Sequence, residues 1–172
     1  MAGTGDSGRL HELCARMQGC ISPYAGRVEY GNLRMRVSDW DCQREPSTNI
    51  ALVYETPGGS TDQINITFHH RSGQFCLVDA SRGEVSTEDL DAVVEAVMGR
   101  IRDIPERRRE TLRAEIRRFV DGGNTNTAGL VMKINREMQS TFKGGTITHI
   151  ELKDALTYAV QYMQGRNGGR PG

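Results

Sequence analysis

The chain has 172 residues, of which 37% are hydrophobic and 26% charged, the composition of an ordinary globular protein. Lysine plus arginine and aspartate plus glutamate both number 22, so no overall charge attracts nucleic acid or an anionic membrane, and such binding would need a local patch. No stretch approaches the roughly 18 consecutive apolar residues of a membrane span, and the first residues lack the pattern of a signal peptide. We therefore expect a cytoplasmic protein without a membrane partner.

A disordered start is expected over residues 1–8, and a helix over residues 7–19. Apolar residues recur in this helix at spacings of three, four and seven, which places them on one face. That face should cover a sheet. Its residues are Leu10, Leu13, Cys14 and Met17.

The next two strands are predicted as a hairpin. Val28–Tyr30 should pair with Leu33–Val37 around a Gly31-Asn32 turn, because glycine in the first position suits a type II′ turn. Residues 38–47 break the alternation and are expected to form a loop.

The clearest alternation lies in residues 63–69, which predicts a strand buried on one face only. If Ser72-Gly73 is a two-residue hairpin loop, Phe68 lies opposite Leu77 in the following strand. The preceding strand then presents a matching apolar face, on which Ile50, Leu52 and Tyr54 lie opposite Phe68, Ile66 and Ile64.

From Ser86 the apolar period changes from two residues to about 3.6, which predicts a helix. Ser86 is its expected cap, with Asp89 in the place of the usual glutamate of a capping box. The helix should end near Asp103, because Pro105 suits the first turn of a new helix. The apolar stripe consists of Leu90, Val93, Val94, Val97, Ile101 and Ile104.

Three further helices with narrow apolar stripes are expected over residues 105–120, 127–142 and 148–164. Thr148 and Glu151 make a capping box at the start of the last one. Narrow stripes indicate helices that pack on each other. The glycine-rich residues 165–172 are expected to be a disordered tail.

These elements together predict an α+β fold. An antiparallel sheet of about five strands should be flanked by an N-terminal helix and a long covering helix, and followed by a C-terminal helical segment. The α+β domain is expected over residues 9–104, and residues 105–164 should pack on it or form a small subdomain.

No metal, cofactor or catalytic group is predicted. The four cysteines lack the paired spacing of a structural zinc site and should be reduced, since the chain is long enough to fold without disulfides. His69 and His70 are neighbours in a strand, so their rings point to opposite faces and cannot share one metal. Local signatures of a nucleophile, such as G-x-S-x-G, are absent from the sequence.

One local excess of charge stands out. Between Arg100 and Arg118 there are eight arginines against four acidic residues. On a helix their guanidinium groups could bind phosphates or an acidic partner, or the neighbouring glutamates could share ion pairs with them on a solvated face. The candidate anion-binding residues are Arg107, Arg109, Arg113, Arg117 and Arg118, of which the second, third and fourth recur every four residues.

The favoured function is a non-enzymatic protein-binding module: an adaptor, chaperone-like or assembly component that binds another protein or forms a homodimer. The narrow apolar stripes between residues 112 and 163 motivate this expectation, since they leave apolar surface for a partner. One alternative is a nucleic-acid-binding protein that uses the Arg-rich helix 105–120. Another is an enzyme or small-molecule binder whose pocket lies between sheet and helices, lined by His70 or Tyr54.

Overall fold

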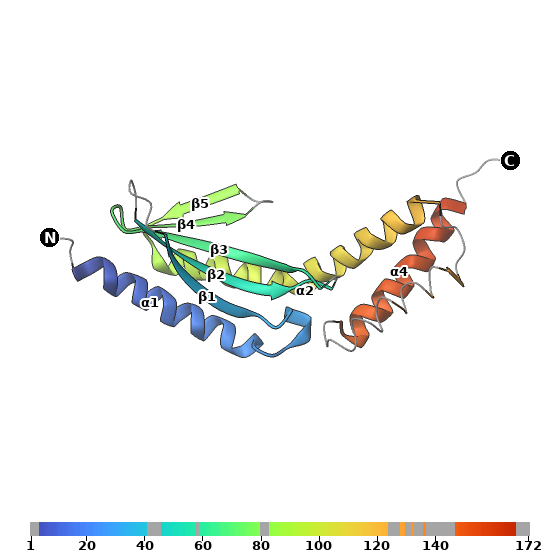
Figure 1. Ribbon diagram of the computed structural model, residues 1–172, viewed down its shortest axis with the longest axis horizontal. Helices are drawn as coiled ribbons and strands as arrows, with labels where there is room; N and C mark the ends of the chain where they lie inside the picture. Colours follow the sequence, from blue (N-terminus) through green and yellow to red (C-terminus); the bar gives the residue numbers. More distant parts are fainter. Residues whose placement is uncertain are drawn as a thin grey trace.

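The computed structural model describes residues 4–40, 46–57, 59–79, 83–123, 128, 129, 132, 136 and 147–167. A five-stranded sheet and the helices on it form a body, and a pair of helices extends beyond the end of the sheet as an arm (Figure 1). The α+β class is confirmed, with an antiparallel sheet, an N-terminal helix, a long helix and a C-terminal helix.

The strands lie in the sheet in chain order, and each runs antiparallel to the next. The first and the last strand are therefore the two edges of the sheet. The strands are β1 (Arg34–Trp40), β2 (Ser47–Glu55), β3 (Thr61–His69), β4 (Gln74–Asp79) and β5 (Gly83–Thr87).

The registers around β3 differ by two residues from those that the sequence predicts. Phe68 pairs with Phe75 rather than with Leu77, because the chain reverses through a turn over residues 70–73 and not through Ser72-Gly73 alone. A shift by two residues keeps every side chain on its face, so the predicted apolar face is confirmed. On the other side of β3, Ile50 and Leu52 pair with Ile66 and Ile64.

The predicted hairpin before β2 is wrong in its first half. Val28–Tyr30 forms a short 3-10 helix, η2, and β1 pairs with β2 instead. Gly31 ends η2 in the left-handed region at φ 62°, and its N–H donates to the carbonyl of Val28 at 2.8 Å. The carbonyl of Gly31 in turn accepts the N–H of Glu55 at 2.7 Å. The glycine therefore ties the start of β1 to the end of β2.

Both long helices of the body begin at other residues than predicted. Helix α1 (Thr4–Ile21) starts inside the stretch expected to be disordered. Helix α2 (Leu90–Asp121) starts after β5, a strand that the sequence pattern did not reveal. Its cap is Asp89 and not Ser86, since the Asp89 carboxylate accepts the N–H of Asp91 at 2.9 Å.

Helix α2 also continues through Pro105, where a break is predicted. A proline removes one backbone hydrogen bond and disfavours a helix interior. Ile101 and Ile104 before it and Arg108 after it are all buried, however. Packing on both sides of the proline thus overrides the local preference.

Helix α4 (His149–Asn167) begins with the predicted capping box. The N–H of Thr148 donates to Glu151 Oε2 at 2.9 Å, and the N–H of Glu151 donates to Thr148 Oγ1 at 3.1 Å. Of the helix predicted over residues 127–142, the structure describes only residues 128, 129, 132 and 136, and all four are helical. Residues 165–167 of the predicted tail belong to α4, and the rest of the tail lies outside the described residues.

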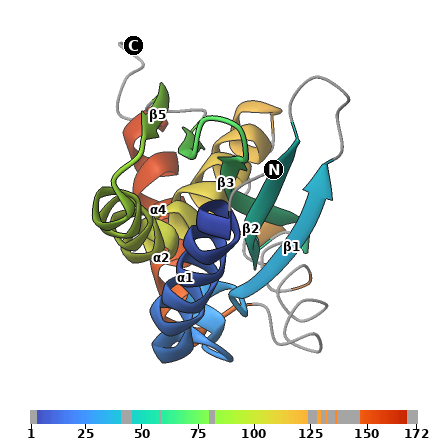
Figure 2. The same ribbon diagram turned by 90° about the vertical axis from the view of Figure 1, so that its left-hand side faces the viewer.

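Two hydrophobic clusters hold the molecule together. The body core lies between the sheet and helices α1 and α2, which cover the same face of the sheet (Figure 2). The arm core joins residues 106–121 of α2 to α4, and these two segments are the arm. Its buried residues are Ile116, Val120, Ile147, Ala155, Ala159 and Met163.

Replacing Gly31 by alanine should destabilise the fold more than replacing Gly26. Both have positive φ, 62° and 74°, which costs an alanine about 1 to 2 kcal/mol. A Cβ on Gly31 would also lie 2.4 Å from the carbonyl oxygen of Glu55, whereas a Cβ on Gly26 would meet nothing within 4 Å. We expect G26A to lower the free energy of unfolding by about 1 to 2 kcal/mol and G31A by roughly 3 kcal/mol or more. Urea denaturation measures both, and equal losses would contradict the close packing of Gly31.

Candidate functional site

Arg108 is buried where the sheet, α2 and α4 meet, with only 1% of its surface exposed. Its Nε donates to Glu151 Oε1 at 2.8 Å, and its Nη2 donates to Glu151 Oε2 at 3.2 Å. A third nitrogen, Nη1, donates to the backbone carbonyl of Glu55 at the end of β2. This junction of Arg108, Glu151 and Glu55 connects the body to the arm through one guanidinium group.

The sequence reading missed Arg108 as a distinct residue. It picked out Glu151 as half of a capping box, which the structure confirms. The ion pair joins residues 43 positions apart in the chain, and no local pattern indicates a contact of that kind. Because both side chains are buried, the junction is a structural feature and offers no surface to a ligand.

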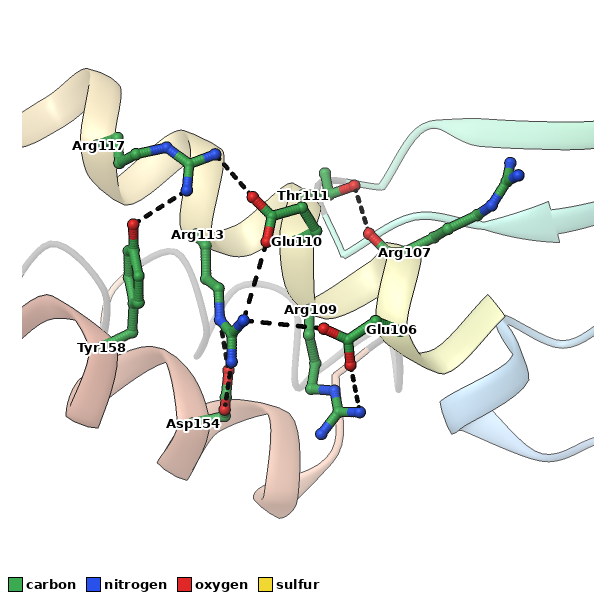
Figure 3. Close-up of polar contacts among 9 residues, drawn as sticks. All are labelled: Glu106, Arg107, Arg109, Glu110, Thr111, Arg113, Arg117, Asp154 and Tyr158. Atoms are coloured by element: carbon green, nitrogen blue, oxygen red, sulfur yellow. Dashed lines mark hydrogen bonds and ion pairs between the residues drawn. The ribbon is translucent and has the colours of Figure 1, made fainter. Parts of the chain in front are cut away.

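The arginine row, Arg109, Arg113 and Arg117, lies on the side of α2 that faces α4 (Figure 3). Arg113 donates two hydrogen bonds to Asp154 of α4, at 3.0 and 3.2 Å. Arg117 donates to the hydroxyl oxygen of Tyr158 at 2.9 Å. The row therefore holds the two helices of the arm together.

Acidic residues of α2 share the charge of the same row. Glu106 lies 2.5 Å from Arg109, and Glu110 lies 2.8 Å from Arg117. Arg113 is 3.8 Å from each of these glutamates. The hydrogen bonds that Arg113 donates to Asp154 raise the pKa of Arg113, and the one that Arg117 donates to Glu110 raises the pKa of Arg117. Three cations thus stand among three carboxylates, of which Glu106 and Glu110 belong to α2 and Asp154 belongs to α4.

The other two candidate anion-binding residues lie apart from the row. The side chain of Arg107 extends toward the sheet (Figure 3), on the side of Tyr54. Arg118 is exposed near the end of α2. The structure therefore brings three of the five predicted arginines together, and these three face another helix.

Tyr54 and His70 do not line one pocket. Burial and the hydrogen bond from its hydroxyl to Asp62 at 2.7 Å raise the pKa of Tyr54 to about 12. His70 Nε2 lies 2.8 Å from the hydroxyl of Thr48, which sits six residues before Tyr54 on β2, roughly 20 Å along the strand. The two side chains thus belong to opposite ends of the sheet.

The two hydrogen bonds of the Thr48 hydroxyl show whether His70 donates or accepts. The hydroxyl of Thr48 donates its only proton to Asp39 Oδ1 at 2.7 Å. His70 Nε2 must therefore be the donor in its own bond to Thr48. A histidine that donates there cannot act as a base toward this hydroxyl, so the cluster lacks the geometry of an activated nucleophile.

A metal site and a membrane-spanning helix each have requirements that the described part of the chain does not meet. No three His, Cys, Asp or Glu side chains gather there as ligands, and no helix there is long and apolar enough to cross a membrane. Cys14, Cys20 and Cys76 are free thiols, and burial raises the pKa of each. Cys42 lies outside the described residues.

The edge strand β1 is accessible over part of its length. Its side chains from Arg36 to Asp39 are exposed on both faces of the sheet. Val37 pairs with the core residue Ile50, so it projects on the helix-covered face, yet it is 48% exposed. The helices α1 and α2 therefore do not cover this end of the strand.

No family model, curated protein or solved structure matches the chain. Its function must be argued from its own geometry.

Removing either side chain of the junction should destabilise the protein strongly. The variants E151Q and R108M each leave a buried group without its partner, and we expect each to lower the free energy of unfolding by about 3 to 5 kcal/mol. The exposed ion pair of Arg16 and Asp91, 2.5 Å apart, is the matched control. D91N should change the free energy of unfolding by less than about 1 kcal/mol. Chemical denaturation of the variants tests this, and similar losses for both pairs would contradict it.

Charge reversal at Arg113 in the arginine row should destabilise the fold, whereas charge reversal at the exposed Arg118 should not. R113E replaces two hydrogen bonds to Asp154 by repulsion, so we expect it to lower the free energy of unfolding by about 1 to 3 kcal/mol. R118E makes the same charge change at an exposed site and should stay within about 0.5 kcal/mol. Nucleic-acid binding lost in R118E at unchanged stability would instead favour the nucleic-acid alternative.

Proposed function

We propose that the chain is a non-enzymatic protein-binding module that adds a strand of its partner to the edge strand β1. The observation that carries this proposal is the exposure of β1 on both faces from Arg36 to Asp39, at the edge of a sheet. An edge strand presents unpaired N–H and C=O groups, which an extended segment of another chain can pair with.

The side chains of β1 supply features that such a partner would use. Val37 leaves about half of its surface uncovered, and an apolar side chain of an added strand would bury it. Arg34 and Arg36 are exposed on the opposite face, called the open face here because α1 and α2 do not cover it. They pair with Val53 and Ala51, which alternate with the core residues of β2. Acidic side chains on the same face of a partner strand would complement them.

The arm gives less support to binding than the sequence predicts. Within the described residues, most of the apolar stripes of residues 112–120 and 152–163 pack against each other in the arm core. The arginine row has three carboxylates within 4 Å, so its charge is balanced before any nucleic acid approaches. Within the described residues, the edges of the sheet present backbone groups that no neighbouring strand pairs with.

Capture of a partner should depend on Val37 and not on Val78. Both valines are about half exposed, 48% and 54%, but Val78 lies on the inner strand β4. V37K places a charge beside the proposed added strand, so we expect the partner identified with the wild-type chain to bind at least about tenfold more weakly. V78K should bind it as the wild type does.

The binding is measured with purified partner, and circular dichroism checks that both variants are folded. Equal binding by V37K and V78K, or no partner captured by the wild-type chain and no self-association, would contradict the proposed function.

A further inference from the structure

The two edge strands carry matching side chains, and this bears on which partner β1 accepts. On β1, Arg36 is followed by Val37 and Ser38. On β5, Glu84 is followed by Val85 and Ser86. The two triplets differ only in the sign of the charge at their first residue.

The pairing of each edge strand shows where these side chains project. Val85 pairs with the core residue Leu77, so it projects on the helix-covered face, as Val37 does, and it is 44% exposed. Glu84 pairs with Val78, and so it projects on the open face, as Arg36 does. Each edge therefore has a half-exposed valine on one face and a charge on the other.

The direction of the strands allows the two edges to meet. Five strands that alternate in direction leave β1 and β5 parallel to each other. A second copy with its helices on the same side of the sheet then places its β1 parallel to β5 of the first. In the register that sets the two triplets side by side, Arg36 lies beside Glu84 and Val37 lies beside Val85, and the two valines cover each other. Cys76 Sγ donates to Glu84 Oε1 at 2.8 Å, which leaves Oε2 for the arginine.

Charge disfavours the two symmetric pairings. A two-fold pairing of β1 with β1 brings Arg34 and Arg36 of both copies onto the same open face, next to each other. A two-fold pairing of β5 with β5 does the same with Glu84. Only the pairing of β5 with β1 brings opposite charges together.

We propose that the chain associates head to tail with itself, with β5 of one copy as the strand added to β1 of the next. This proposal rests on the proposed function and names its partner as a second copy. Such an interface is heterologous, and the twist of the sheet rotates each copy relative to the last, so the assembly has no fixed size. The paired segment spans only the five residues of β5, which makes the association weak and dependent on concentration.

Sedimentation velocity over a wide concentration range tests the proposal. The mean mass of the wild-type chain should rise with concentration. R36E and E84R each place like charges side by side, so each alone should weaken the association by about tenfold. The matched controls are R71E, at the exposed turn between β3 and β4, and E95R, on the exposed side of α2, and both should associate as the wild type does.

Mixing the two variants gives the decisive result. In a mixture of R36E and E84R every contact between unlike copies again joins opposite charges, so association should recover. Recovery in the mixture supports the proposed pairing, whereas equal weakening by R71E or no recovery overturns it. If the wild-type chain stays monomeric, self-association is overturned. If it then still captures another protein, and V37K does not, the proposed function stands.

Discussion

The buried ion pair of Arg108 and Glu151 sets the relation between the two parts of the molecule. A buried charge without its partner is strongly unfavourable, so the arm can occupy only positions in which both groups meet. The guanidinium also binds the carbonyl of Glu55, and the carboxylate also caps α4 through Thr148. One interaction thus aligns the end of β2, the middle of α2 and the first turn of α4.

This constraint also explains how the two described helices of the arm pack. Once α4 is held against α2, the small side chains of Ala155 and Ala159 allow the two helices to pack closely, and the apolar stripes are buried between them. The arginine row then faces α4, where Asp154 and Tyr158 bind two of its members. Within the described residues, Arg113, Arg117 and the apolar side chains of the arm core are thus used in holding the two helices of the arm together.

The sequence predicts the faces of the elements better than their ends. Alternation in β3 places Ile64, Ile66 and Phe68 in the core, and a register shift of two residues leaves them there. Pro105 misleads, because a local preference is overridden by burial on both sides of it. Arg108 escapes detection among eight arginines of similar context, since its burial depends on a residue 43 positions away. Long-range contacts of this kind are absent from local patterns.

The edges of the sheet show how charge can select a partner. Charged side chains on an edge strand usually prevent sheets from joining. On this chain the open face carries Arg36 at one edge and Glu84 at the other. Repulsion between like charges therefore opposes each symmetric pairing, and attraction between opposite charges favours the pairing of β5 with β1. Any other protein that adds a strand to β1 would have to compete with β5, and an acidic residue followed by a β-branched one is the pattern with which it could do so.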